Sequence, residues 1–584
     1  MRQNNLSIHS ENILPIIKKW LYSDKDIFIR ELVSNACDAL NKVRIIEGDG
    51  GEFKISIGID KGHKTITISD TGIGMTEEEV EKYIAQIAFS GAEEFVEKYK
   101  AQTERDPIIG HFGLGFYSSY MVASRVEIDT LSYLPGALPV SWSCDGSSTY
   151  TIGLGLKDAR GTKITLHLDE ESLEYLEESK LKELLNRHCG FMPFPIELNG
   201  KAIGNQEPLW LKSPADCSDK EYLAFYRRLF PRDPEPIFWI HLNVDYPFHL
   251  KGILYFPKIH RRFDANESTI KLFCNRVFVS DNCKDILPDY LMILRGAIDS
   301  PDIPLNVSRS YLQVDKNVKQ LSSHISKKVS DRLNQLYKTD REKYIASWPD
   351  VEMIVKLGLL QDEKFYERIK DVLIWKNREG EWTTLPEGKK IFYSTTETSP
   401  LLKLYKGEIL FATAPIDTAV IQFLESKLDV EFQRIDGALD ASLLDPEREK
   451  TLLDSEGKTE SARIAAFIQK AVGVDVEAKS LASDQLPGIV VLDENERRLR
   501  DYMALTQGKG NSLPAKKTFV VNTNNKLIQA IARMHANKPE MADSIAKSIY
   551  DLSLLSQREI EPADLEQIVS RQTEILEKMA TLLG

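Results

Sequence analysis

The sequence lacks the features that define several large classes of protein. Its 584 residues include only six cysteines, and none forms a Cys-x-x-Cys pair, so the spacing of a zinc site is absent and a reducing compartment is indicated. No apolar run reaches the about 18 residues that a transmembrane helix needs, and the first residues contain no apolar segment typical of a secretory signal. We therefore expect a cytoplasmic protein with no membrane partner.

An excess of positive charge is also missing. The formal net charge is −13, within a composition that is 42% hydrophobic and 28% charged. That composition is typical of a globular protein, and the negative balance disfavours a protein whose main task is to bind nucleic acid. We therefore expect no nucleic acid among the partners.

The length of the chain and its turn-rich stretches predict several domains. A chain this long exceeds one hydrophobic core, and about two to four domains are expected. Asn-Gly, Gly-Asn and two prolines mark a break near 198–214, and the charged segment 436–459 marks another. We expect an α+β multidomain fold with domains at 1–205, 206–440 and 441–584, the last mainly helical. Within the second domain, 271–279 is expected to be one strand.

The stretch 30–40 predicts a helix with a narrow polar strip. At about 100° per residue, Glu31, Asn35 and Asp38 fall at roughly 0°, 40° and −20°, with apolar residues on the far side. A solvated face of an amphipathic helix is one interpretation. Asn and Asp are poor helix formers, so the strip also fits one wall of a binding site.

A second signal is the segment Ser-Asp-Thr-Gly-Ile-Gly-Met at 69–75, which follows a strand and precedes a capped helix start at Thr76. Asp70 can accept a hydrogen bond from the exocyclic amine of adenine. Gly74 would let a flat base lie against the main chain. A tight turn with a capping aspartate is the alternative.

A third signal is the segment Gly-His-Phe-Gly-Leu-Gly-Phe at 110–116, which opens a predicted helix at 116–122. Backbone N–H groups at a helix start bind anions, and glycines let a loop wrap phosphates. The segment is not a Walker A loop, because no Gly-Lys-Ser/Thr follows. Further on, Thr162 places a hydroxyl at the start of a strand, where it can join the recognition of a base.

Together these groups indicate a site for ATP and Mg²⁺. The amide oxygen of Asn35 suits Mg²⁺, which prefers oxygen ligands and usually bridges phosphates. Glu31 can orient or deprotonate the attacking water. Asp38 and Asp70 would lie deeper, toward the ribose and the base.

In order and spacing, the motifs resemble those of the GHKL ATPase superfamily: Glu31-x-x-x-Asn35-x-x-Asp38, Asp70-x-Gly72-x-Gly74-Met75, Gly110-x-x-Gly113-x-Gly115 and Gly161-Thr162. The surroundings at 26–32, 109–118, 295–300 and 305–313 resemble the 90-kDa heat-shock chaperone family in its bacterial form. The resemblance implies an N-terminal GHKL (Bergerat) α/β sandwich, an α/β middle domain and a C-terminal dimerisation domain.

The resemblance also implies the roles of individual residues. ATP would be held by Asn35, Asp38, Asp70, Gly74, Met75, Gly110, Gly113, Gly115, Phe116 and Thr162, with Mg²⁺ on Asn35. Glu31 would be catalytic together with Arg309 and Gln313, and Arg309 would contact the γ-phosphate. A surface ion pair is the alternative for Arg309. A lid would span about 84–113.

The implied function is an ATP-dependent chaperone that remodels partly folded client proteins, in cooperation with other chaperones. Its homodimer would form through C-terminal helices, since 541–555 and 565–582 carry apolar stripes. These stripes can instead pack internally. The segment 496–505 aligns with a client-binding element, or is a core helix.

The sequence departs from the family pattern beside the lid. Ala85 replaces a hinge glycine, and Phe89 replaces a lysine that can meet phosphate or ribose. Two other functions therefore stay open at this point. A nucleotide-binding scaffold with little hydrolysis would show little ATP turnover, and a DNA-acting GHKL ATPase would need a basic second domain.

Overall fold

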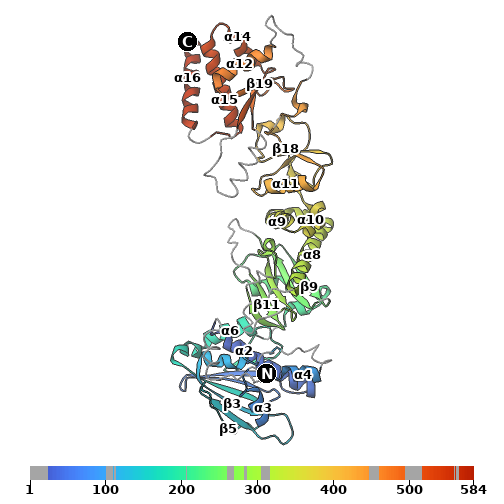
Figure 1. Ribbon diagram of the computed structural model, residues 1–584, viewed down its shortest axis with the longest axis vertical. Coiled ribbons are helices and arrows are strands. Elements are labelled where there is room, and N and C mark those ends of the chain that lie inside the picture. The colour runs from blue at the N-terminus through green and yellow to red at the C-terminus, as the bar shows by residue number, and fades with distance from the viewer. Residues whose placement is uncertain are drawn as a thin grey trace, which may run out of the picture. The chain divides into compact units, whose positions relative to one another are not determined.

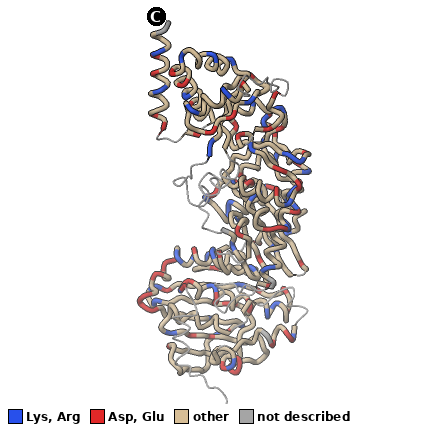
Figure 2. Tube along the Cα trace, turned by 45° about the horizontal axis from the view of Figure 1, so that its top comes forward, with Lys and Arg blue, Asp and Glu red and all other residues tan. Residues whose placement is uncertain are grey.

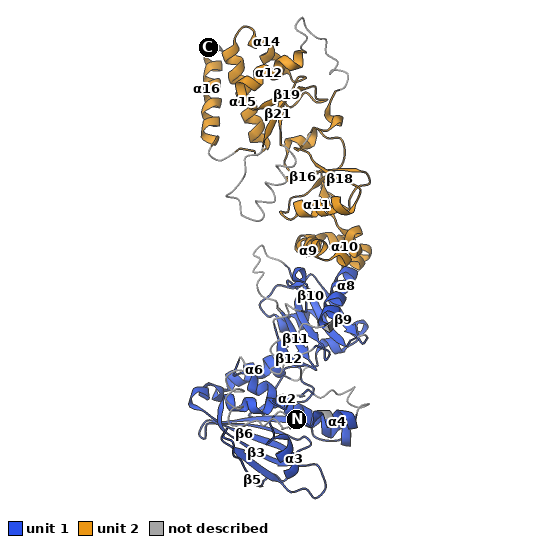
Figure 3. Cartoon of the chain, in the orientation of Figure 1, with its two compact units in different colours: residues 1–332 blue, residues 333–584 orange. Residues whose placement is uncertain are grey.

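The computed structural model describes residues 24–87, 89–99, 109–110, 113–204, 207–246, 248–258, 269–281, 286–303, 316–437, 439–445, 459–492, 516–557, 559–560 and 564–583. The chain divides into two compact units, 1–332 and 333–584 (Figure 3). Both combine helices with sheets (Figure 1), which confirms the expected α+β multidomain architecture. The expected division into three domains, with two boundaries, is finer and stays a prediction.

Charged residues of both signs are interspersed along the described chain (Figure 2). None of the described helices combines the length and the apolarity needed to cross a membrane.

An eight-stranded sheet forms the base of the first unit, in the order β5-β4-β3-β6-β2-β1-β7-β8. Its strands are β1 Ile55–Asp60, β2 Thr65–Asp70, β3 Ala123–Leu131, β4 Val140–Cys144, β5 Thr151–Leu154, β6 Gly161–Leu168, β7 Ile196–Leu198 and β8 Lys201–Ile203. In the sequence, isoleucines alternate with other residues at 55–59 and 66–68, a pattern that predicts a β-hairpin with one buried face. Strands β1 and β2 form that antiparallel hairpin, with Ile57 opposite Ile68. Alternation buries one face of these strands and leaves the other half-exposed.

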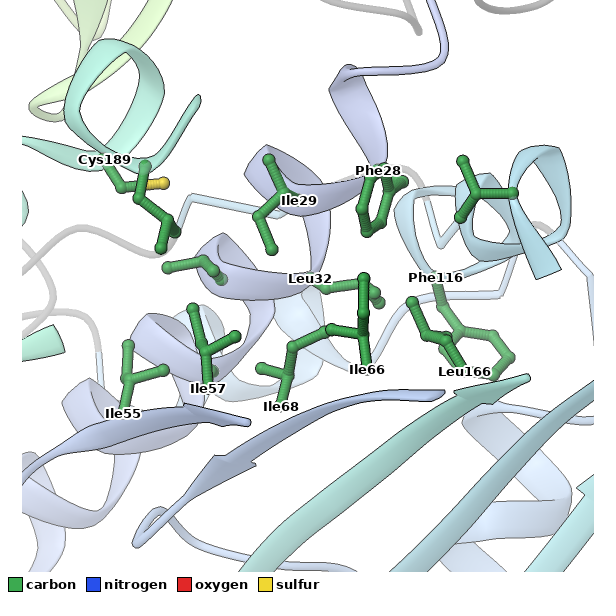
Figure 4. Packing of buried hydrophobic residues seen from close by; sticks show 14 of the residues in the cluster. Phe28, Ile29, Leu32, Ile55, Ile57, Ile66, Ile68, Phe116, Leu166 and Cys189 are labelled. Carbon is green, nitrogen blue, oxygen red and sulfur yellow. The ribbon is translucent and has the colours of Figure 1, made fainter. Parts of the chain in front are cut away.

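Helix α2 (Ile27–Glu47) crosses the buried face of this sheet, beside the 3-10 helix η2 (Gly115–Met121). Figure 4 shows Leu32 of α2 lying above Ile66 and Ile68 of β2. The other helical segments of this part are α3 Glu77–Tyr83, α4 Ala92–Lys98, η3 Glu170–Leu176 and α6 Glu178–Cys189. Because the helix is buried on nearly every side, its polar strip faces the protein interior and not bulk water.

A second sheet of five strands follows within the same unit, in the order β12-β11-β13-β10-β9. Its elements are η4 Leu209–Leu211, η5 Pro214–Asp216, α7 Asp219–Leu229, β9 Phe238–Val244, β10 Leu250–Phe256, β11 Thr269–Cys274, β12 Val277–Ser280, η6 Asp289–Leu291 and β13 Arg295–Asp299. The single strand expected at 271–279 is wrong. Asn275 and Arg276 both adopt positive φ (50° and 65°) and turn the chain into the β11–β12 hairpin.

Helix α8 (Lys316–Thr339) leads from the first unit into the second. The second unit begins with α9 Arg341–Gln361, α10 Glu363–Ile369, η7 Lys370–Val372, β14 Trp375–Asn377, β15 Trp382–Thr383, β16 Lys390–Ser394, η8 Pro400–Lys403, β17 Ile409–Phe411, α11 Asp417–Lys427 and β18 Glu431–Arg434. Here the buried Lys356 ammonium bonds the carboxylates of Glu352 and Asp417 and lies 4.3 Å from the centre of the Trp375 ring. These contacts tie α9 to α11.

The last part of the chain is mainly helical, around a three-stranded sheet in the order β19-β21-β20. Its elements are η9 Ala441–Leu443, α12 Glu460–Val472, β19 Asp475–Lys479, β20 Gly488–Leu492, β21 Lys517–Asn522, α14 Lys526–His535, α15 Pro539–Gln557 and α16 Leu565–Leu583.

Candidate nucleotide site

A cavity of about 380 Å³ opens beside α2 in the first unit. Every described residue that the sequence predicted for the ATP site lines it: Glu31, Asn35, Asp38, Asp70, Gly74, Met75, Gly110, Gly113, Gly115, Phe116 and Thr162. Its volume lies within the range of small-molecule sites. Arg309 and Gln313 lie outside the described residues, as does the segment 496–505.

Glu31 occupies one end of the polar strip and is 4% exposed. The Arg30 guanidinium donates to its Oε1 from Nε at 3.1 Å and from Nη2 at 2.9 Å. The other oxygen, Oε2, faces the glycine-rich loop, and a Cβ on Gly115 would lie 2.6 Å from it. A glycine at this position therefore lets the loop main chain approach the carboxylate.

Asn35 lies one helical turn further along the strip and is half-buried. Its side-chain amide makes no hydrogen bond with any residue that the structure describes. A cavity-lining amide of this kind keeps its carbonyl oxygen available for a ligand.

Asp38 makes contacts that the sequence interpretation did not include. Its Oδ1 accepts the Ile109 N–H and its Oδ2 accepts the Gly110 N–H, both at 2.7 Å. The sequence placed this carboxylate toward the ribose and the base. In the structure, both oxygens hold the main chain where the glycine-rich loop begins, and the placement toward the ribose and the base stays a prediction.

Asp70 is the last residue of β2 and lines the same cavity. Its Oδ1 accepts the Gly72 N–H at 2.8 Å and the Thr162 N–H at 3.3 Å. Burial raises the pKa of this carboxyl to about 6, although those N–H groups and Lys157 act to lower it. Oδ2 accepts no hydrogen bond from the described residues, so it remains open to a donor in the cavity.

Gly74 and Met75 follow Asp70 along the cavity wall. Gly74 has φ of +65°, and a Cβ there would overlap the main-chain carbonyl of Leu131, so only glycine fits. The Met75 N–H donates to the hydroxyl of Thr130 at 3.0 Å. That hydroxyl also lies 2.9 Å from the Thr162 hydroxyl.

The glycine-rich loop closes the third side of the cavity. Gly113 has φ of +64°, and a Cβ there would lie 2.5 Å from the Phe89 carbonyl oxygen. The helix expected at 116–122 is present as η2, a seven-residue 3-10 helix at Gly115–Met121. Phe116 packs edge-on against Trp142, with ring centres 5.8 Å apart. An anion bound here would therefore meet loop amides more than the start of a long helix.

Sequence reasoning missed the basic end of the strip, although it predicted a lid over the segment that forms the lid-side wall. Lys42 lines the cavity four residues after Asp38. This helical spacing could have identified Lys42 as a cavity residue from the sequence. Burial lowers the pKa of this ammonium, which lies 5.5 Å from the centre of the Phe95 ring. The lid-side wall consists of Tyr83, Ile84, Phe89, Ser90, Gly91, Ala92, Glu94, Phe95 and Lys98.

An ionic and aromatic cluster joins the two short helices of the lid-side wall. Lys82 Nζ contacts both Glu94 oxygens, at 2.9 and 3.0 Å, and Tyr83 donates to Glu94 at 3.1 Å. The ring of Phe89 stacks on Tyr83, with centres 6.1 Å apart. These contacts connect the end of α3 to α4.

The donor set fits a magnesium ion held mainly by a nucleotide. The described residues contain no group of three or more His, Cys, Asp or Glu side chains that could hold a metal unaided. Mg²⁺ in nucleotide sites commonly takes one or two protein oxygens, substrate phosphates and water. The unbonded amide oxygen of Asn35, on the cavity wall beside Glu31, meets that requirement.

Comparisons with known proteins agree with this site. Residues 26–172 match the family described as Histidine kinase-, DNA gyrase B-, and HSP90-like ATPase, and residues 199–582 match the family described as Hsp90 protein. Chaperone protein htpG of Bacteroides fragilis is 40% identical over 578 residues, which cover 91% of this chain and 84% of the relative. Chaperone protein HtpG of Porphyromonas gingivalis is 41% identical over 579 residues, with the same coverage. Chaperone protein HtpG of Geobacter metallireducens is 30% identical over 617 residues and covers 94% of each chain. Since the match to Hsp90 spans more than half of the chain and these relatives cover most of it, the chain is an ATPase that belongs to the Hsp90 family.

Proposed function

We propose that ATP binding and hydrolysis in the cavity beside α2 drive N-terminal closure of a C-terminally dimerised clamp. Through that cycle, this ATP-dependent chaperone would remodel partly folded client proteins. The observation that carries the proposal is that one cavity gathers a buried carboxylate at Asp70, an unbonded amide at Asn35 and the oriented carboxylate of Glu31.

The adenine base would lie between Asp70 and Gly74. Oδ2 of Asp70 is the acceptor for the exocyclic amine, because Oδ1 is already bonded to two backbone N–H groups. Gly74 keeps the wall flat, and the Thr162 N–H donates to the same carboxylate. The phosphates would then extend toward Gly113 and Gly115.

The phosphate end brings together the groups needed for hydrolysis. Asn35 would supply an oxygen to Mg²⁺, which when bound neutralises charge on the phosphates. Glu31 would accept the proton of the attacking water, a role that contributes roughly 10²–10⁴-fold in rate. Arg30 holds the Glu31 carboxylate in one orientation, and Asp38 fixes the loop that faces the phosphates.

Catalysis would be completed by the middle domain. Arg309 is proposed to contact the γ-phosphate, with Gln313 near it, so that the domain at 206–440 must dock on the domain at 1–205. The lid at 84–113 would close over the nucleotide in the same step. Such docking couples chemistry to a change of shape.

Dimerisation through the C-terminal domain at 441–584 is supported by the apolar stripe of α16. Part of the helix packs on α15, where Arg571 Nε donates to Asp551 at 2.8 Å and Ile568 is 4% exposed. Beside this contact, apolar side chains remain exposed: Leu565, Val569, Leu576 and Met579. Internal packing therefore covers only part of the stripe within the described chain, and the exposed remainder favours pairing with a second copy.

Clients, cooperation with other chaperones and a cytoplasmic location remain part of the proposal. They are supported by the family and by the printed names of the relatives, which are chaperone proteins.

Sedimentation and energy transfer together test the clamp. We expect the full chain to sediment as a dimer at micromolar concentration, and Leu576→Asp with Met579→Asp to yield monomers. Leu138→Asp is the matched control, because Leu138 is exposed in the first unit. ATP should raise energy transfer between dyes on the two N-terminal domains of the dimer, but not in Asp70→Asn. A stripe variant that stays dimeric would refute the interface.

A further inference from the structure

Gln557, the last residue of α15, bonds the outer edge of the three-stranded sheet. The strand order is β19-β21-β20, so β20 pairs with β21 on one side and has an open side. There, Gln557 Oε1 accepts the Val490 N–H at 2.8 Å, and Gln557 Nε2 donates to the Val490 carbonyl oxygen at 2.7 Å. The side-chain amide thus makes both bonds that the opposite residue of a neighbouring antiparallel strand would make.

The end of α15 is held to the sheet in two further ways. Lys517 of β21 donates from Nζ to the main-chain carbonyl of Glu559, just past the helix, at 2.9 Å. Apolar packing also contributes, since Leu554 of α15 is buried in one cluster with Val490. Apolar contact is non-directional, whereas hydrogen bonds prefer a narrow range of angles. The paired bonds of Gln557 are therefore suited to fix the position of α15 along β20.

Helix α16, which carries the apolar stripe, is joined to the rest of the described chain through α15. Arg571 donates to Asp551 from Nε at 2.8 Å and from Nη2 at 3.0 Å. Ser548 donates to the Gln572 side chain at 2.5 Å. Within the part of the chain that the structure describes, the side chains of α16 form hydrogen bonds and ion pairs with no other element. The orientation of α16 therefore follows that of α15.

We propose that Gln557 is a positioning residue for the dimer interface. Its amide holds α15 at one place along β20, and α15 in turn holds α16 so that the exposed part of the apolar stripe faces a second copy of the chain. Gln557 acts through α15 and needs no contact with the second copy. This inference rests on the proposed function, since it assumes that the stripe of α16 forms the dimer interface.

A general contribution of Gln557 to stability predicts a different outcome. Loss of its amide would then affect the dimer no more than loss of any comparable contact in the same part of the chain. Asn525 offers that comparison, because its Oδ1 accepts the Leu527 N–H at 2.9 Å and the Ile528 N–H at 3.4 Å at the start of α14. No hydrogen bond between described residues joins the Asn525 side chain to α15 or α16. The deciding quantity is therefore the dimer dissociation constant at similar loss of stability.

The test is sedimentation of the full chain over a range of concentrations, with thermal unfolding of the same samples. Gln557→Met keeps the length of the side chain and removes the amide, and its dimer dissociation constant should rise about tenfold. Asn525→Ala should lower the unfolding temperature similarly but keep the dissociation constant within about twofold. Gln557→Glu keeps an acceptor for the Val490 N–H and loses the donor, so it should give an intermediate rise, and it decides the question should Gln557→Met not fold. A Gln557 variant that dimerises like the unmodified chain, or an equal loss in Asn525→Ala, overturns the inference.

The stripe variant, Leu576→Asp with Met579→Asp, separates failure of this inference from failure of the proposed interface. If the stripe variant stays dimeric, both the interface and the inference are wrong. If it yields monomers while Gln557→Met keeps the unmodified dissociation constant, the interface stands and only the role of Gln557 is wrong. Hydrogen exchange at the Val490 amide checks the contact itself. It should become faster in Gln557→Met, and unchanged exchange there would also overturn the inference.

Discussion

Arg30 donates two hydrogen bonds to a single oxygen of Glu31, from Nε at 3.1 Å and from Nη2 at 2.9 Å. Both side chains are buried in α2. Charge-assisted bonds of this kind are stronger than neutral ones, and in a buried place they fix the carboxylate. Because both bonds end on Oε1, the second oxygen is directed toward the glycine-rich loop. We therefore expect Arg30 to position the Glu31 carboxylate, which is proposed to accept the proton of the attacking water.

Nucleotide affinity should depend on pH through Asp70. Its folded pKa of about 6 lies above the ordinary value of 3.8. The native state therefore retains a proton that the unfolded chain has released, and this contribution to stability is present below pH 3.8 and lost as pH rises through 6. Binding has the opposite sign, because a proton on Oδ2 would make that oxygen a donor, and it could then not accept the exocyclic amine. We expect ADP to bind about tenfold more weakly at pH 5 than at pH 7.

Asp70→Asn is the control for this titration. Its affinity for ADP should be low and should not change between pH 5 and pH 7. A fall of equal size in the variant would assign the pH dependence to another group. No histidine is among the described residues that line the cavity.

Gly74 and Gly136 form a matched pair for testing whether the cavity wall needs a glycine at position 74. Both have positive φ, +65° and +81°, but a Cβ at Gly136 meets nothing within 4 Å, whereas one at Gly74 overlaps the Leu131 carbonyl. Gly136→Ala should therefore lower the free energy of unfolding by about 1–2 kcal/mol through strain alone. Gly74→Ala should lower it further and weaken ADP binding. Thermal unfolding and titration measure both, and equal effects in the two variants would count against the close approach.

Asp38→Ala should release the start of the glycine-rich loop. The variant removes the acceptors of the Ile109 and Gly110 N–H groups, and charge-assisted bonds of this type contribute about 1.5–3 kcal/mol each. We expect faster hydrogen exchange at those two amides and weaker nucleotide binding. Asp60→Ala is the control, because Asp60 accepts two backbone N–H groups in an exposed turn. Unchanged exchange at 109 and 110 would show that the loop has another anchor.

Phe89→Lys should tighten nucleotide binding. Phe89 lines the cavity where the family pattern has a lysine, and an ammonium there would attract phosphates. We expect several-fold tighter ADP binding at low ionic strength, with the gain shrinking as salt is added. Phe89→Leu should show no gain. Equal affinities for Phe89→Lys and the unmodified chain at low salt would mean that the position does not face the phosphates.

The parts of the site that follow local rules could be predicted from the sequence. Alternating isoleucines predicted the β1–β2 hairpin, and helical spacing predicted that Glu31, Asn35 and Asp38 share a strip. Glycine positions identified the places where only a bare main chain fits, as the overlap at Gly74 shows.

Other contacts could not be predicted, because they depend on tertiary structure. The bonds from Asp38 reach 71 residues along the chain to Ile109, and no local pattern encodes that distance. The turn at Asn275 and Arg276 was missed because no glycine marks its positive φ angles. The Thr130 hydroxyl, which accepts the Met75 N–H, was missed because Thr130 lies behind the cavity and outside every motif.

The most direct test of the account is ATP turnover of Glu31→Ala in the full chain, with nucleotide affinity measured on the same sample. Glu31 faces the glycine-rich loop and makes none of the contacts proposed for the adenine ring. The affinity for ADP should therefore stay within about twofold of that of the unmodified chain. Turnover should fall by at least about 100-fold, the lower limit expected for loss of a general base. A variant that binds nucleotide and hydrolyses ATP at the unmodified rate would contradict the central claim.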